Sequence, residues 1–540
     1  MTRNSNNLAQ TGLTANDQVI EAVESGRMVS TEVIDLPVGS VTGLRHGRVC
    51  EFKAIPYGHT TAGMSRFMPP VGLKRWNGVL ECRTYGPACP QNNPDLDAWR
   101  DNGEASENCL VLNIWTPDLK PKQMIPVMVW LHGGAYSTGS GGLDLYDGAS
   151  LAREQEVVVV SINHRLNIFG YLHLDGAHAD FEDSANLGQQ DIVLALRWIK
   201  ENIACLGGDN SNVTIFGESG GGAKASVLCA MPSAAGLFHK VIIQSGSFLN
   251  VLTEEQAQLR AEHVLEYLGV ETRNIRDIQK LSVERLLAAE RNLTERFGLG
   301  AFWPVCDGVV IPEGAWERSA PHFVGDVPML IGTTLDESAY FTPQSVFGTP
   351  PTDLTSLRKA LLRCCEPFEV LGADILGLVD EYLAISEAGS YLDLLLEITS
   401  DVLFWRTALI QAEAQSEQAP VYMYRFDWKY PCFGGAYALH GAEIPFVFGN
   451  LDYELPAWDL HDSPAGRSAA DPDNIRYELS RSMQHAWANF ARTGQPSTPT
   501  LPNWPAFTPS RRATMIFDRT CCVCVDPGKQ RRELLFRSTN

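Results

Sequence analysis

The chain has 540 residues, of which 44% are hydrophobic and 20% charged, and its formal net charge is −21. This is the composition of a globular protein with enough apolar residues for a sizeable core. The acidic balance argues against nucleic acid and anionic membranes as partners, and no window approaches the ~18 apolar residues of a membrane span.

We expect one large folding unit, because no internal repeat, low-complexity tract or long flexible linker divides the chain. A polar N-terminal segment, residues 1–30, precedes a single domain over residues 31–540. The first residues show no apolar core of a secretory signal, so the expected location is the cytoplasm. The 13 cysteines form no framework. Cys521 and Cys524 have CxxC spacing but lack a second pair or a nearby histidine, so no metal is expected.

Short apolar runs recur along the chain. Turn residues between β-rich runs predict a hairpin region over residues 39–58. Seven later runs have strand character, and most are apolar throughout, as in strands that are buried on both faces. These runs cover residues 126–132, 156–163, 212–216, 240–244, 327–332, 421–426 and 513–517.

Helical stretches lie between these runs. In "QDIVLALRWIKENIA", residues 190–204, the side chains of Ile192, Leu196 and Ile199 fall near one face. The alternation of strand and helix predicts an α/β fold with a large, mostly parallel central sheet and helices on both faces.

Two further segments look helical and fit no strand alternation. They lie near residues 250–300 and 345–415, and we expect them to be excursions that cover the active site beside the sheet. In a parallel sheet the reactive groups lie at the carboxyl ends of the strands. The chemistry is therefore expected directly after the apolar runs.

One serine lies in the only G-x-S-x-G sequence of the chain, "GESGG" at residues 217–221. A sharp turn from strand to helix would expose Ser219 above the sheet edge, and Gly217 and Gly221 stand where a Cβ would collide across the turn. The amides that begin the next helix favour negative charge beside the serine oxygen. A glycine-rich turn with an incidental serine is the alternative, but the flanking strand and helix favour a nucleophile.

A serine nucleophile needs a base and an acid, which follow it in the order acid, histidine in this architecture. His440 stands in a loop rich in small residues after a predicted strand, and it is the expected base. His485 lies in an amphipathic helix and His461 in a polar loop, where structural roles are expected. Asp336 and Glu337 follow a buried strand, and spacing alone does not choose between them.

A glycine-rich loop, "VWLHGGAYSTGSGG" at residues 129–142, also follows a predicted strand directly. Successive amides that no side chain obstructs can point at a carbonyl oxygen as it becomes an oxyanion. A flexible turn is the alternative, but the loop ends the strand at which an oxyanion hole is expected.

Together these residues resemble the type-B carboxylesterase/lipase family, which includes the cholinesterases. The likeness extends from about residue 40 to 525, with landmarks such as "SENCLVLNIWTP", "WLHGGAYSTGS", "LGGDNSNVTIFGESGG", "TLDESAYF" and "HGAEIPFVFG". It implies the α/β-hydrolase fold, a small-molecule ester as partner and no cofactor. We expect a monomer or small homo-oligomer. The region after "SGSFLNVL", where the family has its second disulfide, contains no cysteine, which favours a bacterial or fungal type of esterase.

The resemblance assigns the roles that spacing leaves open. The family's acid is the glutamate of "DES", which selects Glu337, and its histidine, the one in "HG.E", corresponds to His440. Its oxyanion amides correspond to Gly134, Ala135 and Gly220. The last position is most often alanine in the family, and glycine keeps the donor but makes the helix start more flexible.

The resemblance also places a substrate pocket. Its expected lining includes Trp99, Phe302 and Tyr340. Trp99 resembles in placement the tryptophan that stacks on choline in cholinesterases; an aromatic residue that covers the core is the alternative. Gly300 stands where acetylcholinesterases have a bulky aromatic, so we expect a permissive pocket with room for acyl groups larger than acetyl.

Two features of the resemblance stay open. Ser245 corresponds to the family's buried serine that supports the triad, but a core hydroxyl bonded only to backbone fits it equally. Cys89 and Cys109 correspond to a disulfide that secreted members share, and in a reducing cytoplasm these thiols can be free.

The sequence therefore predicts a serine carboxylesterase that works through an acyl-enzyme. His440 takes the proton of Ser219, and Glu337 steadies the imidazolium that forms. Acyl transfer to an alcohol other than water is an alternative that uses the same triad. A non-catalytic, cholinesterase-like binding module is a second alternative, which would be expected to lack the nucleophile.

Overall fold

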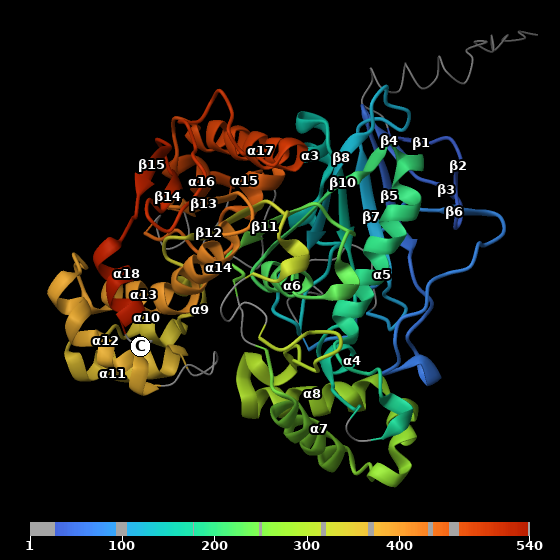
Figure 1. Ribbon diagram of the computed structural model, residues 1–540, viewed down its shortest axis with the longest axis horizontal. Helices are drawn as coiled ribbons and strands as arrows, with labels where there is room; N and C mark the ends of the chain where they lie inside the picture. The colour runs from blue at the N-terminus through green and yellow to red at the C-terminus, as the bar shows by residue number, and fades with distance from the viewer. Residues whose placement is uncertain are drawn as a thin grey trace, which may run out of the picture.

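The computed structural model describes residues 28–92, 105–175, 178–247, 251–314, 320–365, 372–429, 436–452 and 464–537. A twelve-stranded sheet runs through this part of the molecule (Figure 1). Its strands, in spatial order, are β1 (Val29–Ser30), β4 (Leu44–His46), β5 (Val49–Pro56), β7 (Val111–Thr116), β9 (Val158–Ile162), β8 (Ile125–Leu131), β10 (Gly208–Glu218), β11 (Lys240–Gln244), β12 (Met329–Thr334), β13 (Val421–Phe426), β14 (Ala513–Phe517) and β15 (Cys522–Val525). A smaller sheet joins β2 (Ile34–Leu36), β3 (Gly39–Thr42) and β6 (Val79–Glu81).

The strands from β9 to β14 in this order are all parallel. They are the seven apolar runs that the sequence predicts as strands, and the prediction that both of their faces are buried is confirmed. Along β8, Val127, Val129 and Leu131 join one hydrophobic core, whereas Met128 and Trp130 join another on the opposite face. Successive side chains of a strand point to opposite faces, so a strand between two cores has no polar side.

Helices cover both faces of the sheet. The first core is built against α5 (Leu187–Asn202), α6 (Gly220–Leu228) and α14 (Arg406–Ser416), and the second against α3 (Ala149–Gln155), α15 (Ile444–Phe448) and α17 (Ile475–Thr493). As the sequence pattern predicts, α5 buries Ile192, Leu196 and Ile199 and exposes Lys200. The remaining described α-helices that lie outside the two excursions are α4 (Asn167–Tyr171), α9 (Ser338–Phe341), α16 (Pro464–Ala470) and α18 (Lys529–Arg537).

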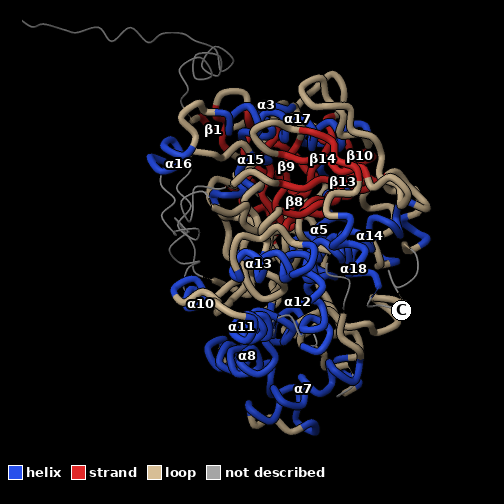
Figure 2. Tube along the Cα trace, turned by 90° about the vertical axis from the view of Figure 1, so that its left-hand side faces the viewer, coloured by secondary structure: helices blue, strands red, loops and turns tan. Residues whose placement is uncertain are grey.

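The two segments expected to be helical excursions are helical. The first forms α7 (Glu254–Leu268) and α8 (Val283–Phe297), and the second forms α10 (Gln344–Gly348), α11 (Leu354–Cys365), α12 (Gly372–Ile385), α13 (Tyr391–Ser400) and α14. Local signals begin these helices: Thr253 and Gln256 form a reciprocal capping box at α7. Figures 1 and 2 both place α7, α8, α11 and α12 below the sheet. None of the described helices combines the length and the apolarity needed to cross a membrane.

The carboxyl ends of the parallel strands meet at one edge of the sheet. β10 ends one residue before Ser219, and β12 ends three residues before Glu337. β8 leads into the glycine-rich loop, and the chain after β13 leads to His440. Strands far apart in the sequence therefore deliver the predicted catalytic residues to a shared edge, as parallel topology requires.

Cys89 and Cys109 are buried free thiols in this structure. A hydrogen bond with the thiol of Cys89, together with burial, raises the pKa of Cys109 well above its usual value. Cys89 Sγ also accepts a hydrogen bond from the backbone N–H of Leu166 at 3.3 Å. Of the two states that the sequence left open, the structure has the reduced one.

Candidate active site

Ser219 occupies a strained corner between β10 and α6. Its φ of 55° and ψ of −123° lie outside the usual regions for a residue with a side chain. The corner is held by its backbone: Ser219 N–H donates to the carbonyl of Gln244 at 2.8 Å, and the Ser219 carbonyl accepts from Ala223 N–H at 2.9 Å. Strain of this kind persists only where the surroundings enforce it, and here it presents the serine at the sheet edge.

The glycines around the serine are required by close packing. A Cβ on Gly221 would lie 1.9 Å from the carbonyl oxygen of Leu131, and a Cβ on Gly217 would lie 2.5 Å from the carbonyl carbon of Gly221. Helix α6 therefore contacts the end of β8 backbone to backbone. The predicted collision across the turn is the physical reason for the sequence "GESGG".

His440 pairs with Glu337 and not with its neighbour Asp336. The imidazole Nδ1 lies 2.5 Å from Glu337 Oε2, and both side chains are buried. Glu337 Oε1 accepts from the backbone N–H of Thr334 at 2.9 Å, which fixes the carboxylate in place. Asp336 instead accepts from the backbone N–H of Ala438 at 2.8 Å, so it holds the loop that leads to the histidine.

The other imidazole nitrogen of His440 faces the serine corner. Nε2 lies 3.1 Å from Oε1 of Glu218, the residue directly before Ser219. Among the described residues no hydrogen bond joins the imidazole to the serine hydroxyl, and Nε2 has no hydrogen-bond partner there. Loose geometry of this kind is common before a substrate is bound.

Buried carboxyl groups set the protonation of His440. Burial acts to lower its pKa, but the charges of Glu218 and Glu337 outweigh burial and raise the pKa to about 9. Burial raises the pKa of Glu218 and of Glu443, whose Oε1 accepts from Gln244 Nε2 at 3.2 Å. The surroundings thus stabilise an imidazolium ion, which is the species that forms when the histidine takes a proton.

The predicted oxyanion residues come together at the same corner. Gly134 and Ala135 follow β8 with φ of 88° and 51°, and a Cβ on Gly220 would lie 2.4 Å from the backbone nitrogen of Ala135. A Cβ on Gly133 would lie 3.6 Å from the Cβ of Ser219. The glycine-rich loop therefore lies directly against the start of α6.

Comparison with known proteins decides the family. The chain matches the family model described as "Carboxylesterase family" over residues 30–534. The chain belongs to the carboxylesterase family. The para-nitrobenzyl esterase of Bacillus subtilis (strain 168) is 38% identical over 522 residues, which cover 94% of this chain and 99% of that one. Carboxylesterase 1E of Rattus norvegicus is 32% identical over 500 residues, 85% of this chain and 84% of that one.

A solved structure agrees with this assignment. A thermophilic PNB esterase matches with a TM-score of 0.79 at 37% identity, covering 93% of this chain and 99% of that one. The fold of this carboxylesterase-family chain is thus the α/β-hydrolase fold, and its class is that of carboxylic ester hydrolases. The resemblance drawn from the sequence motifs is confirmed.

Aromatic rings surround the imidazole of His440. The ring centres of Tyr340, Phe341 and Phe404 lie 6.0, 4.8 and 5.0 Å from it. Tyr340, a pocket residue expected from the sequence, is 46% exposed beside the histidine, and its role in binding a substrate stays a prediction. Phe404 lies in the π-helical segment Asp401–Trp405 that joins α13 to α14, so the second helical excursion reaches the imidazole of His440.

No contact with His440 is described for the other residues that the sequence predicts for the pocket and the triad's surroundings. Phe302 is only 1% exposed and packs in the first hydrophobic core, where no described contact joins it to His440. Trp99 lies outside the described residues, as does His461. Ser245 is buried with φ of 49°, and its hydroxyl has no hydrogen-bond partner within the described part of the chain. The role of each of these residues stays a prediction.

Several residues of the site escaped the sequence reasoning. Glu218 stands inside the motif, and Glu443 stands in the landmark "HGAE", so both were visible as carboxylates next to predicted catalytic residues. Phe341 follows Tyr340 directly. Phe404 gave no comparable signal, because it lies in a helical run whose apolar residues read as core.

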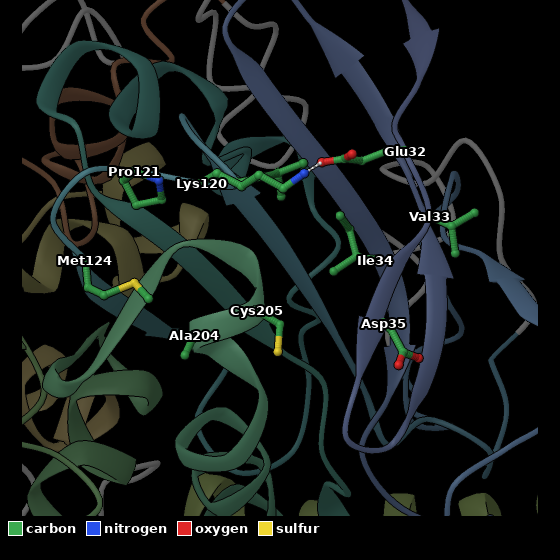
Figure 3. A pocket seen from close by; sticks show the side chains of 10 residues that line it. Glu32, Val33, Ile34, Asp35, Lys120, Pro121, Met124, Ala204 and Cys205 are labelled. Atoms are coloured by element: carbon green, nitrogen blue, oxygen red, sulfur yellow. Dashed lines mark ion pairs between the residues drawn. The ribbon is translucent and has the colours of Figure 1, made fainter.

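An open pocket of about 400 Å³ lies near the amino end of β8, away from the carboxyl ends that carry the predicted catalytic residues (Figure 3). Ile34, Met124 and Cys205 contribute to its lining, and an ion pair of 2.7 Å joins Lys120 to Glu32 beside it. Met124 directly precedes β8, whereas the oxyanion loop follows β8, so a strand of about 20 Å separates the two places. This pocket is therefore no part of the candidate active site.

Proposed function

We propose that this chain is a serine carboxylesterase with Ser219 as nucleophile, His440 as base and Glu337 as the acid of the triad. The observation that carries the proposal is the position of His440, bound through Nδ1 to Glu337 with Nε2 at the serine corner. A buried carboxylate fixes the tautomer in which Nε2 is free to accept a proton. An ester is the substrate class that the family implies.

The reaction proceeds in two halves. Ser219 Oγ attacks the ester carbonyl while His440 Nε2 takes its proton, and the oxyanion lies against the amides of Gly134, Ala135 and Gly220. The imidazolium returns the proton to the departing alcohol and leaves an acyl-enzyme. Water then attacks with the same base, which releases the carboxylic acid and restores the serine.

The proposal extends to the substrate. The aromatic rings of Tyr340, Phe341 and Phe404 beside His440 favour esters with apolar or aromatic groups. This is consistent with the para-nitrobenzyl substrate in the name of the Bacillus relative. We expect a permissive pocket that accepts more than one acyl length.

Two measurements test the function. Hydrolysis of p-nitrophenyl acetate, butyrate and octanoate should be catalysed, and a p-nitrophenyl phosphonate should add covalently to Ser219, as located by mass spectrometry of the digested protein. Protein that releases no p-nitrophenol from any of the three esters would refute ester hydrolysis. A product ester formed with added butanol, in place of free acid, would favour the acyltransferase alternative.

Although this position is most often alanine in the family, Gly220→Ala is expected to lower kcat/KM of this chain by about 10- to 100-fold, since here a Cβ overlaps the backbone of Ala135 and must displace the oxyanion loop. Steady-state kinetics with p-nitrophenyl butyrate measure the loss. Gly377→Ala is the control, because a Cβ there meets nothing within 4 Å and the site is distant in α12. Equal kcat/KM values for the two variants would contradict a role for Gly220 in placing the loop.

Glu218→Gln is expected to shift the acidic limb of the kcat/KM profile to lower pH, by about one unit. The charge of Glu218 raises the pKa of His440, and the imidazole must be neutral to act as base. Removing that charge lowers the pKa, so the neutral form persists to lower pH. Profiles between pH 6 and 11, a range that brackets the pKa of about 9, test this, with the exposed Glu284→Gln as control. A shift to higher pH would contradict the assignment.

A further inference from the structure

A lysine is buried behind the candidate oxyanion loop. Lys224 lies on α6, five residues after Ser219, and its side chain is fully buried. Its Nζ donates a hydrogen bond to the backbone carbonyl of His132 at 2.9 Å. Among the described residues no carboxylate lies within ion-pair distance of this amine.

The surroundings of Lys224 are costly for an amine. A cation–π contact with Tyr136, at 5.9 Å from Nζ to the ring centre, offsets only a small part of this cost, and the His132 ring stacks on the ring of His164 at 4.9 Å. Burial lowers the pKa of Lys224 to about 7, and burial together with the charge of Lys224 lowers the pKa of His164. An apolar side chain would fill this space without the cost of dehydrating an amine, so packing alone does not account for a lysine.

The bond from Lys224 belongs to a series of anchors along the loop. The carbonyl of Gly133 accepts from His132 Nδ1 at 2.8 Å, and the carbonyl of Gly134 accepts from the backbone N–H of Thr138 at 3.0 Å. In a planar trans peptide the C=O and the following N–H point in opposite directions. Holding the carbonyls of residues 132, 133 and 134 therefore directs the N–H groups of residues 133, 134 and 135.

We propose that Lys224 is a positioning residue for the oxyanion loop, which it ties to the helix that carries Ser219. The inference rests on the proposed function, because it gives Lys224 a role only if the loop amides bind an oxyanion. The loop needs such a tie, since Gly133 and Gly134 constrain their own backbone little. The lysine side chain is long enough to reach from α6 to the end of β8. It therefore fixes the position of the loop amides relative to the nucleophile Ser219.

The bond does not depend on the charge of the lysine. A neutral amine still carries N–H groups, so the anchor persists on both sides of a pKa near 7. The expected defect on removing it is thus a loss of transition-state binding at every pH, and not a new limb in the pH profile.

Lys224→Met tests the inference, because methionine keeps an unbranched apolar stem and removes the donor. Rates are expressed per active site, counted by the burst of p-nitrophenol from a phosphonate, so that only folded enzyme contributes. We expect kcat for p-nitrophenyl butyrate to fall about 10- to 100-fold with KM changed less than about twofold. Affinity for a trifluoromethyl ketone, which forms a tetrahedral oxyanion on the serine, should fall by a similar factor.

Three further variants test whether the effect is specific to the hydrogen bond of Lys224. Lys224→Leu also lacks a donor and gives a second measurement if the methionine variant folds poorly. Lys224→Gln, which keeps N–H groups on a shorter stem, should recover part of the lost kcat. Lys240→Met is the matched control, since Lys240 is a partly buried lysine at the amino end of β11 whose amine bonds Asn212.

The outcomes separate this inference from the function on which it rests. A per-site kcat and ketone affinity equal to wild type in Lys224→Met and Lys224→Leu would overturn the positioning role, while the esterase assignment would stand. A wild type that hydrolyses no ester would overturn both. A loss that is equal in Lys240→Met would also overturn it, because the effect would then not be specific to the loop.

Discussion

Replacing Ser219 by alanine is expected to lower kcat for p-nitrophenyl butyrate by about four to six orders of magnitude. The loss is large because the whole reaction passes through the bond that Ser219 Oγ forms with the acyl group. Residual rate is expected from the amides of the loop, which still polarise the ester carbonyl. Steady-state kinetics at high enzyme concentration, with phosphonate labelling in parallel, measure both the loss and the missing adduct.

A second serine of the same helix provides the control. Ser226 Oγ donates to the carbonyl of Gly222 at 3.0 Å within α6, and it also lies 3.3 Å from the carbonyl of Gly246 and 3.2 Å from Gln411 Oε1. Ser226→Ala should keep kcat within about threefold, since it removes neutral hydrogen-bond contacts of a buried hydroxyl and no reacting atom. Substantial hydrolysis by Ser219→Ala, with Ser226→Ala impaired, would mean that the nucleophile has been assigned to the wrong residue.

The parallel strands could be predicted because their burial leaves a plain pattern. A run such as residues 156–163 is apolar throughout, since helices cover both faces of the sheet. β7 was not predicted as a strand because it carries a buried asparagine. Asn113 accepts from the backbone N–H of Ala54 at 2.9 Å and donates to Ser161 Oγ at 3.0 Å, partners that only the folded sheet supplies.

The candidate site could be predicted where chemistry depends on a local motif, and not where it depends on distant chain segments. The strand-to-helix turn at Ser219 is defined by five consecutive residues, so the glycines of the motif are enough to predict it. The meeting of Glu218 with His440 joins residues more than 200 positions apart, and nothing in either local sequence records the 3.1 Å between them. Phe404 reaches the histidine through a helical segment for the same reason.

Lys224 stands out in the sequence itself. It is the one charged residue in "GGGAKASVLCAM", a helical segment of small and apolar residues with no polar face. A charged side chain on such a helix either leaves part of the helix exposed to solvent or is buried in a specific interaction. Burial without such an interaction is unfavourable, because the amine loses its hydration and gains no partner carboxylate. A lysine in this setting is therefore a candidate for a specific interaction even before a structure is known.

Glu337→Gln is expected to lower kcat by about three to four orders of magnitude, whereas Asp336→Asn should keep kcat within about threefold. The two residues are adjacent and equally placed by spacing, but only Glu337 contacts the imidazole. A glutamine can present its NH₂ group to Nδ1, which favours the wrong tautomer, and it has no charge to stabilise the imidazolium. Without that charge the pKa of His440 also falls, so the pH profile of the residual activity should move to lower pH.

The same pair of variants separates a catalytic role from a structural role for each carboxylate. Asp336 accepts a hydrogen bond from the backbone N–H of Ala438 and has no described contact with the imidazole, so its replacement should show in thermal unfolding more than in kcat. Kinetics and unfolding curves for both variants provide the four values needed. If Asp336→Asn loses the larger share of kcat, the acid of the triad is the aspartate; the loop before His440 must then move during catalysis, since in this structure that carboxylate is bound to the loop and not to the histidine.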